Sequence, residues 1–141
     1  MTDVFVDTNV IAYRFDPSEP AKAARATEIL DGPERLVIST QVMLELHSVL
    51  TRKLTPPVSP DVALEVLSEL SRLTVVPADA ELARRAARRV RHEQVSIWDA
   101  MIIEAALQAG CTQLWTEDLA AGHRSDGLLV VNPFDWPRAG P

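Results

Sequence analysis

The chain alternates short, continuously apolar runs with longer segments of helical periodicity, and this alternation limits its possible folds more than any other feature. Each apolar run has the length and β-branched content of a buried strand. The runs cover residues 3–7, 36–39, 73–76, 112–115 and 128–131. Strands that are apolar at every position are buried on both faces, as in parallel sheets covered by helices. The sequence therefore predicts an α/β fold with a central, mostly parallel, five-stranded sheet.

The segments between these runs carry helix start and stop signals. Asp, Ser and Thr precede several of them and can cap the free amide groups of a first turn. Helices are predicted over residues 10–13, 18–30, 41–53, 61–72, 79–92 and 97–108, with Thr40 and Ser96 as caps and Gly110 as a stop signal. Residues 55–60 hold three prolines and 117–127 are polar, so both are predicted loops. Residues 1–141 are expected to form one domain with a short proline-rich tail over 135–141.

Composition narrows the class of protein. The chain has 14 Lys and Arg residues against 20 Asp and Glu residues, a formal net charge of -6 that argues against general affinity for nucleic acid. Its single cysteine, Cys111, excludes an internal disulfide and a cysteine-based structural zinc site. The first residues lack a basic signal region, and no apolar run approaches the ~18 residues of a membrane span. We therefore expect a soluble, cytoplasmic protein without membrane association.

Four acidic residues occupy positions that simple solvation does not explain. Asp7 and Asp118 follow predicted strands, where a helix cap and a turn residue are the ordinary interpretations. Glu45 and Asp99 share the apolar faces of their helices. Their ordinary interpretations are a bent helix that leaves Glu45 at the surface and an anion favoured by the helix dipole at Asp99. Because burying a lone carboxylate is costly, any of these groups that is buried needs a partner.

These four carboxylates converge if the first and fourth strands are neighbours, because parallel sheets place ligands at the carboxyl ends of their strands. Carboxylates so close together repel one another unless a cation lies among them. Oxygen ligands favour Mg²⁺, Mn²⁺ or Ca²⁺, and Mg²⁺ held by carboxylates completes its shell with water and phosphate oxygens. The sequence therefore predicts metal-assisted phosphoryl chemistry. Setting the four site acids aside also leaves the rest of the chain nearly neutral, so its low pI does not exclude a nuclease.

Five short pieces of sequence carry a resemblance to a known family by their order and spacing. They are VDTN at residues 6–9, QVMLEL at 41–46, IWDA at 97–100, WTEDL at 115–119 and VVNPF at 130–134. Together they resemble, across residues 4–134, the PIN-domain ribonucleases of the VapC type, which are the toxins of type II toxin–antitoxin pairs. The resemblance implies a three-layer α/β/α fold and endonucleolytic cleavage of RNA that depends on one or two Mg²⁺ or Mn²⁺ ions. It also implies a homodimer held inactive by a cognate antitoxin.

The resemblance also assigns roles to individual residues. The metal-binding and catalytic acids are Asp7, Glu45, Asp99 and Asp118. The polar residues that support the same pocket are Thr8, Asn9 and Thr116. Because two acids are adjacent after the fourth strand, Glu117 is the alternative to Asp118. In the resulting hypothesis three aspartates hold the metal, Glu45 positions the metal or the attacking water, and cleavage leaves 5′-phosphate and 3′-hydroxyl ends.

A cluster of arginines on one predicted helix is the candidate RNA-binding surface. Its members, spaced at i and i+4, are Arg84, Arg85, Arg88 and Arg89. The ordinary alternative is a solvated face on an alanine-rich helix.

Three other classes of protein are weaker interpretations. A phosphorelay receiver domain needs an Asp after a central strand, where this chain has Val76-Pro77, and a Lys near its last strand. An inactive PIN-like scaffold would have no reason to retain four mutually repelling acids. A PIN nuclease for RNA maturation, without an antitoxin, stays open.

Overall fold

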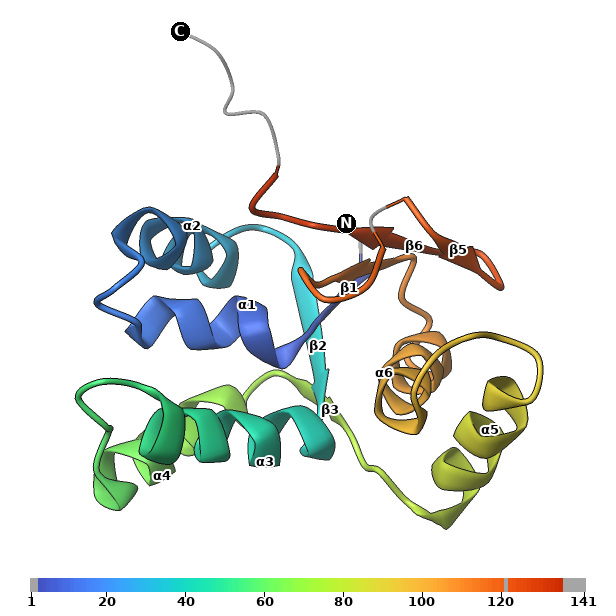
Figure 1. Ribbon diagram of the computed structural model, residues 1–141, viewed down its shortest axis with the longest axis horizontal. Helices are drawn as coiled ribbons and strands as arrows, with labels where there is room; N and C mark the ends of the chain where they lie inside the picture. The colour runs from blue at the N-terminus through green and yellow to red at the C-terminus, as the bar shows by residue number, and fades with distance from the viewer. Residues whose placement is uncertain (1–2, 121, 136–141) are drawn as a thin grey trace, which may run out of the picture.

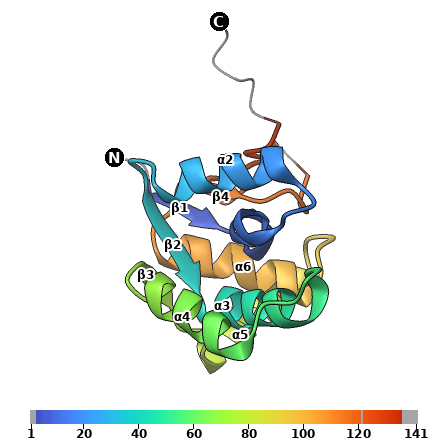
Figure 2. The ribbon, with the colours of Figure 1, turned by 90° about the vertical axis from the view of Figure 1, so that its left-hand side faces the viewer.

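The sheet has six strands in the order β3-β2-β1-β4-β6-β5 (Figure 1; β4 is labelled in Figure 2). The computed structural model describes residues 3–120 and 122–135. The strands are β1 (Asp3–Val6), β2 (Arg35–Ser39), β3 (Thr74–Val76), β4 (Gln113–Trp115), β5 (Arg124–Ser125) and β6 (Leu128–Val131). All neighbouring strands pair in parallel except β5 and β6, which are antiparallel. The mostly parallel sheet is therefore confirmed, and the five predicted strands are all present.

The sixth strand corrects the prediction that residues 117–127 form a loop. Ser125 pairs with Leu128 across a two-residue turn, and Asp126 and Gly127 both have positive φ, at 51° and 87°. Such a turn matches the twist of a hairpin, and Asp-Gly is its usual sequence. The dipeptide was a signal for this hairpin, but the polar residues around it hid the very short strand.

Helices cover the sheet on two sides. The α-helices are α1 (Thr8–Ala12), α2 (Pro20–Leu30), α3 (Thr40–Ser48), α4 (Pro60–Leu70), α5 (Ala80–Val90) and α6 (Ile97–Gln108). A 3₁₀ turn, η1 (Tyr13–Phe15), follows α1, and a π-helical turn, η2 (Val49–Lys53), follows α3. Figure 2 shows α2 on one side of the sheet and α6 on the other, and α6 packs on β2, β4 and β6. This arrangement is the predicted three-layer α/β/α architecture.

The core explains why the central strands are apolar at every position. Val4, Phe5 and Val6 of β1 are fully buried, because β1 lies between β2 and β4 with helices on both faces. The buried apolar side chains, which come from both helical layers and from the sheet, form one continuous cluster. None of the helices in the described part of the chain is long and apolar enough to cross a membrane. The predicted proline-rich tail covers residues 135–141, and all of it beyond residue 135 lies outside the described residues.

Helix boundaries differ from the prediction at two places that matter for the site. Ser39, not Thr40, caps α3, since its hydroxyl accepts the Val42 amide hydrogen at 3.3 Å. The predicted helix over 41–53 is not α-helical to its end, because it changes to the π-helical turn η2 after Ser48. The cap at Ser96 is confirmed, with the Asp99 amide donating to Ser96 Oγ at 3.0 Å.

Candidate active site

Neighbouring strands β1 and β4 deliver the first elements of the site. Val6 pairs with Trp115, so Asp7 and Thr116 leave the sheet side by side at its carboxyl edge. The Asp7 amide donates to the Trp115 carbonyl at 3.0 Å, which carries the pairing one residue beyond the strand. The condition on which the convergence of the acids depended, adjacent first and fourth strands, is therefore met.

Asp7 is a buried carboxylate, with only 6% of its surface exposed. Its Oδ1 accepts the Thr8 amide hydrogen at 2.7 Å, which caps α1, and its Oδ2 accepts the Thr116 hydroxyl at 2.9 Å. Burial raises the pKa of Asp7 to about 6, against the opposing effect of these two hydrogen bonds. The negative charges of Glu45 and Asp118 raise this pKa further.

Glu45 reaches the same place from α3. Its Oε2 accepts the Thr8 hydroxyl at 2.8 Å, and its Oε1 accepts the side-chain amide of Gln41 at 2.7 Å. Gln41 also donates to the Trp98 carbonyl at 3.3 Å, which links α3 to the start of α6. Sequence reasoning missed Gln41 as a site residue, although its i, i+4 spacing to Glu45 was a usable signal.

Asp99 and Asp118 complete the acidic group from α6 and from the loop after β4. Asp99 is half-buried, and burial raises its pKa, with further increases from the charges of Asp118 and Glu45. Asp118 is exposed, and its Oδ2 accepts the Asn9 side-chain amide at 3.0 Å. Since these charges act on one another, the structure brings the four predicted acids into one electrostatic group.

The predicted supporting residues hold the loop after β4 against α1. Asn9 donates to Thr116 Oγ1 at 3.1 Å as well as to Asp118, and its own Oδ1 accepts the Glu117 amide at 3.2 Å. Thr116 Oγ1 also accepts the Asp118 amide at 3.1 Å while its hydroxyl donates to Asp7. This closed set of hydrogen bonds fixes Asp118 relative to Asp7.

The two adjacent acids of the loop face different partners. Glu117 accepts hydrogen bonds from the Tyr13 hydroxyl and from Lys22 Nζ, the latter at 2.9 Å. Lys22 also lies over the Tyr13 ring, 4.7 Å from its centroid, and Tyr13 packs edge-on against Phe134. Glu117 therefore anchors the loop to α2 and η1, whereas Asp118 lines a cavity. This division favours Asp118 as the fourth site acid.

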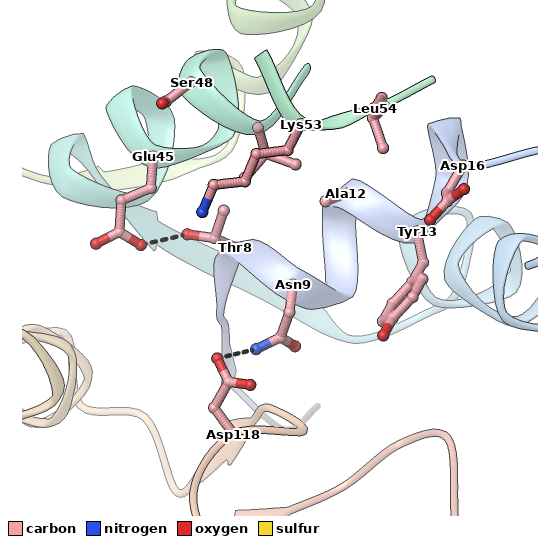
Figure 3. A pocket seen from close by; sticks show the side chains of 11 residues that line it. Thr8, Asn9, Ala12, Tyr13, Asp16, Glu45, Ser48, Lys53, Leu54 and Asp118 are labelled. Atoms are coloured by element: carbon pink, nitrogen blue, oxygen red, sulfur yellow. Dashed lines mark hydrogen bonds between the residues drawn. The ribbon is translucent and has the colours of Figure 1, made fainter. Parts of the chain in front are cut away.

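The cavity has a volume of about 460 Å³ and lies between α1, α3, η2 and the loop after β4. Thr8, Asn9, Glu45 and Asp118 line one part of it (Figure 3). Ala12, Tyr13, Val49 and Leu54 supply apolar surface, and the remaining lining residues are Asp16, Ser48 and Lys53. Asp7 and Asp99 do not line this cavity, and Asp7 bonds to residues at its edge.

The acidic group fits a divalent cation by its chemistry. All its donors are oxygens, and the pKa values of Asp7 and Asp99 are raised by burial and by the negative charges of Glu45 and Asp118. The four carboxylates do not form a closed coordination shell. In the described residues, no three His, Cys, Asp or Glu side chains gather around a common metal position. The residues that would hold a metal are Asp7, Asp99, Asp118 and Glu45.

Three of the four arginines proposed to contact RNA are paired with acids of their own chain. Arg84 pairs with Glu81 at 2.6 Å, and Arg85 lies 3.5 Å from Glu104. Arg89 has only 7% of its side chain exposed and lies within 2.8 Å of three carboxylates, those of Glu93, Glu104 and Asp126. The contacts of Arg85 and Arg89 attach α5 to α6, and Arg89 also attaches it to the β5–β6 turn, a structural role that spacing alone did not reveal.

Arg88 differs from its neighbours on α5. Its side chain is exposed, and it forms no ion pair within the described ranges 3–120 and 122–135. Of the four arginines, it therefore retains the most available charge for an external phosphate.

A protein-family comparison matches the PIN domain to residues 4–123 of the chain. Comparison with curated proteins gives no match. The family match includes Asp7, Glu45, Asp99 and Asp118, and so covers every element that contributes an acid to the site.

Solved structures of similar fold come from toxin–antitoxin systems. VapC20 of Mycobacterium tuberculosis, described as a sarcin-ricin loop cleaving toxin, is 20% identical with a TM-score of 0.64, covering 82% of this chain and 91% of its own. A toxin–antitoxin complex from Klebsiella pneumoniae is 18% identical with a TM-score of 0.69, covering 92% of this chain and 97% of its own. VapBC2 of Rickettsia felis, bound to a DNA fragment from its promoter, is 19% identical with a TM-score of 0.62 and the same coverage.

Proposed function

The chain belongs to the PIN domain family, and we propose that it is a metal-dependent endoribonuclease that acts as the toxin of a VapBC-type toxin–antitoxin pair. The observation that carries this proposal is the acidic group at the carboxyl edge of the sheet, to which the end of β1, α3, α6 and the loop after β4 each contribute one carboxylate. The solved neighbours, a sarcin-ricin loop cleaving toxin among them, support the choice of RNA as the substrate.

In this proposal the residues of the site have different roles. Asp7, Asp99, Asp118 and Glu45 would hold one or two Mg²⁺ or Mn²⁺ ions, which when bound neutralise phosphate charge and lower the pKa of an attacking water. Thr8 and Thr116 fix the Asp7 carboxylate by donating to both of its oxygens. Asn9 fixes Asp118.

Glu45 is oriented by two donors, Thr8 and Gln41, one on each oxygen. A carboxylate has about four acceptor positions, so Glu45 can still accept a hydrogen bond from a water in the cavity. In this proposal Glu45 positions the water that attacks the RNA phosphorus, and the products carry 5′-phosphate and 3′-hydroxyl ends.

The partners follow from the same proposal. We expect an RNA substrate, a cognate small antitoxin and a homodimer acting in the cytoplasm. Complexes between toxin and antitoxin among the solved neighbours support the antitoxin. Growth arrest that a small neighbouring gene relieves would distinguish a toxin from an RNA-maturation nuclease of the same fold.

The test compares the wild type with Asp7→Asn and with Asp61→Asn, a matched change at an exposed acid of α4. Expression of the wild type and of Asp61→Asn should produce discrete new 5′ ends in cellular RNA, and Asp7→Asn should produce none. The purified wild type should cleave RNA in Mn²⁺ and lose all cleavage in excess EDTA. Cleavage by folded Asp7→Asn, or by the wild type in EDTA, would contradict the proposal.

A further inference from the structure

Lys53 brings a cationic group into the acidic cavity. It is the last residue of η2 and lines the cavity together with Thr8, Glu45 and Asp118. Figure 3 shows its ammonium group pointing toward Thr8 and Glu45. Within the described part of the chain the Lys53 side chain forms no hydrogen bond and no ion pair, so its ammonium donors are free.

The π-helical turn explains how Lys53 reaches this position. At about 100° per residue, eight α-helical residues after Glu45 would turn a side chain about 80° away from the direction of Glu45. The turn η2 closes its hydrogen bonds over five residues, as in the 3.2 Å bond from the Leu54 amide to the Val49 carbonyl. Such a turn rotates through a smaller angle per residue, which brings Lys53 back toward the face that carries Glu45. Single π turns of this kind often occur at functional sites.

The charged side chains around the cavity are mostly acidic, and Lys53 offsets part of their negative charge. Asp16, Glu45 and Asp118 line it, and the charges of Glu45 and Asp118 act on those of Asp7 and Asp99. Lys53 is the only Lys or Arg among the described lining residues. An RNA phosphate that enters meets these negative charges, which repel it. A lysine ammonium is a compact charge with three donors on a flexible stem, and lysine is a common phosphate ligand.

We propose that Lys53 is a substrate-binding residue that donates a hydrogen bond to a non-bridging oxygen of the RNA phosphodiester in this cavity. The inference rests on the proposed ribonuclease function and adds to it a phosphate contact on the wall opposite Asp118. It also places the RNA strand, which then runs between η2 and the loop after β4.

The experiment compares Lys53→Met, Lys53→Arg and Arg52→Met in the full chain. Arg52 is the matched control, because it is exposed, precedes Lys53 in the same turn and does not line the cavity. The probe is a fluorescein-labelled 20-nucleotide RNA pool of random sequence, cleaved in Mn²⁺ at several KCl concentrations. The readouts are kcat/KM, the slope of its logarithm against the logarithm of KCl concentration, and the thermal midpoint of each variant.

Lys53→Met should lower kcat/KM about tenfold or more, which is the effect of losing one hydrogen bond to a charged group. It should also reduce the salt slope by about 0.7, the value for one phosphate contact on a single strand. Lys53→Arg should keep the slope, Arg52→Met should match the wild type within about twofold, and all thermal midpoints should agree.

Two results would overturn the inference while leaving the proposed function intact. One is a Lys53→Met variant whose kcat/KM and salt slope equal those of Arg52→Met, while the wild type cleaves the pool. The other is a Lys53→Met variant that loses activity with an unchanged salt slope, since the side chain would then act on the acids and not on phosphate. A wild type that fails to cleave the pool would instead overturn the proposed function and this inference with it.

Discussion

Replacing Asp7 by asparagine should make the metal-free protein more stable at pH 8 while removing its activity. The reason is the pKa of Asp7, which burial raises from an ordinary value of 3.8 to about 6. A carboxyl whose pKa is raised by folding binds its proton more tightly in the folded state. Stability therefore falls as the pH rises from about 4 to about 6, and above that window the ionised carboxylate carries its full cost.

The magnitude follows from that difference in pKa. Since a tenfold change in an equilibrium constant is worth about 1.4 kcal/mol, ionised Asp7 destabilises the folded state by about 3 kcal/mol above pH 6. Asparagine removes this cost and can still accept the Thr8 amide hydrogen. Its NH₂ group would face Thr116 Oγ1, which already accepts from Asn9 and from the Asp118 amide, so about one hydrogen bond worth 1–1.5 kcal/mol is lost. The net stabilisation at pH 8 is about 1–2 kcal/mol.

The assay is thermal or urea unfolding in EDTA at pH 8 and at pH 4, with Asp61→Asn as the control. At pH 8 the midpoint of Asp7→Asn should exceed that of the wild type by about 3–7 °C. At pH 4 the advantage should disappear, because Asp7 is then protonated in the folded wild type. Adding Mn²⁺ should stabilise the wild type and not the variant, since only the wild type keeps the full set of metal ligands.

Two results would refute this reasoning. A difference in unfolding free energy that is the same at pH 4 and pH 8 would show that ionisation of Asp7 carries no cost in the folded state. A variant less stable than the wild type at pH 8 would show that the hydrogen bonds to Asp7 outweigh the cost of its burial. Asp61→Asn should show no such dependence on pH, because its side chain is exposed.

Three further predictions concern residues around the site. Lys22→Met should reduce kcat/KM about tenfold with little change in the unfolding midpoint, because Glu117 loses the ion pair that anchors the loop carrying Asp118. Wild-type activity in this variant would contradict that role. Arg89→Met should lower the free energy of unfolding in urea by about 3 kcal/mol, because the buried guanidinium that joins Glu93, Glu104 and Asp126 is lost, whereas Arg84→Met should change it by less than about 1 kcal/mol. Arg88→Glu should weaken RNA binding and flatten its salt dependence, and an unchanged slope would favour a merely solvated face.

The candidate acids illustrate how far local sequence reasoning reaches. Asp7 and Asp118 could be placed at strand ends, and Glu45 and Asp99 on apolar helix faces, because strand and helix periodicities are local properties. Their convergence depended on one long-range fact, the pairing of β1 with β4, which no local pattern contains. The resemblance to a family supplied that fact indirectly, through the order and spacing of its motifs.

Other features depend on partners far away in the sequence. Glu117 and Asp118 are adjacent and chemically similar, and only their distant partners, Lys22 for one and Asn9 for the other, separate an anchor from a site acid. The arginines of α5 show the same limit, since their spacing predicted a common face but not the α6 acid Glu104, which pairs with both Arg85 and Arg89.

The sequence by itself determined the alternation of strands and helices, the caps at Asp7 and Ser96, and the acidic character of one sheet edge, because backbone propensity and apolar periodicity act over a few residues. The tertiary structure decided which carboxylates share a charge environment, which arginines remain available, and where the π-helical turn directs Lys53. The physical reason is that electrostatic energy and burial depend on distance in space. Residues such as Thr8 and Glu45, or Asn9 and Asp118, acquire a shared role only when the folded sheet brings them into contact.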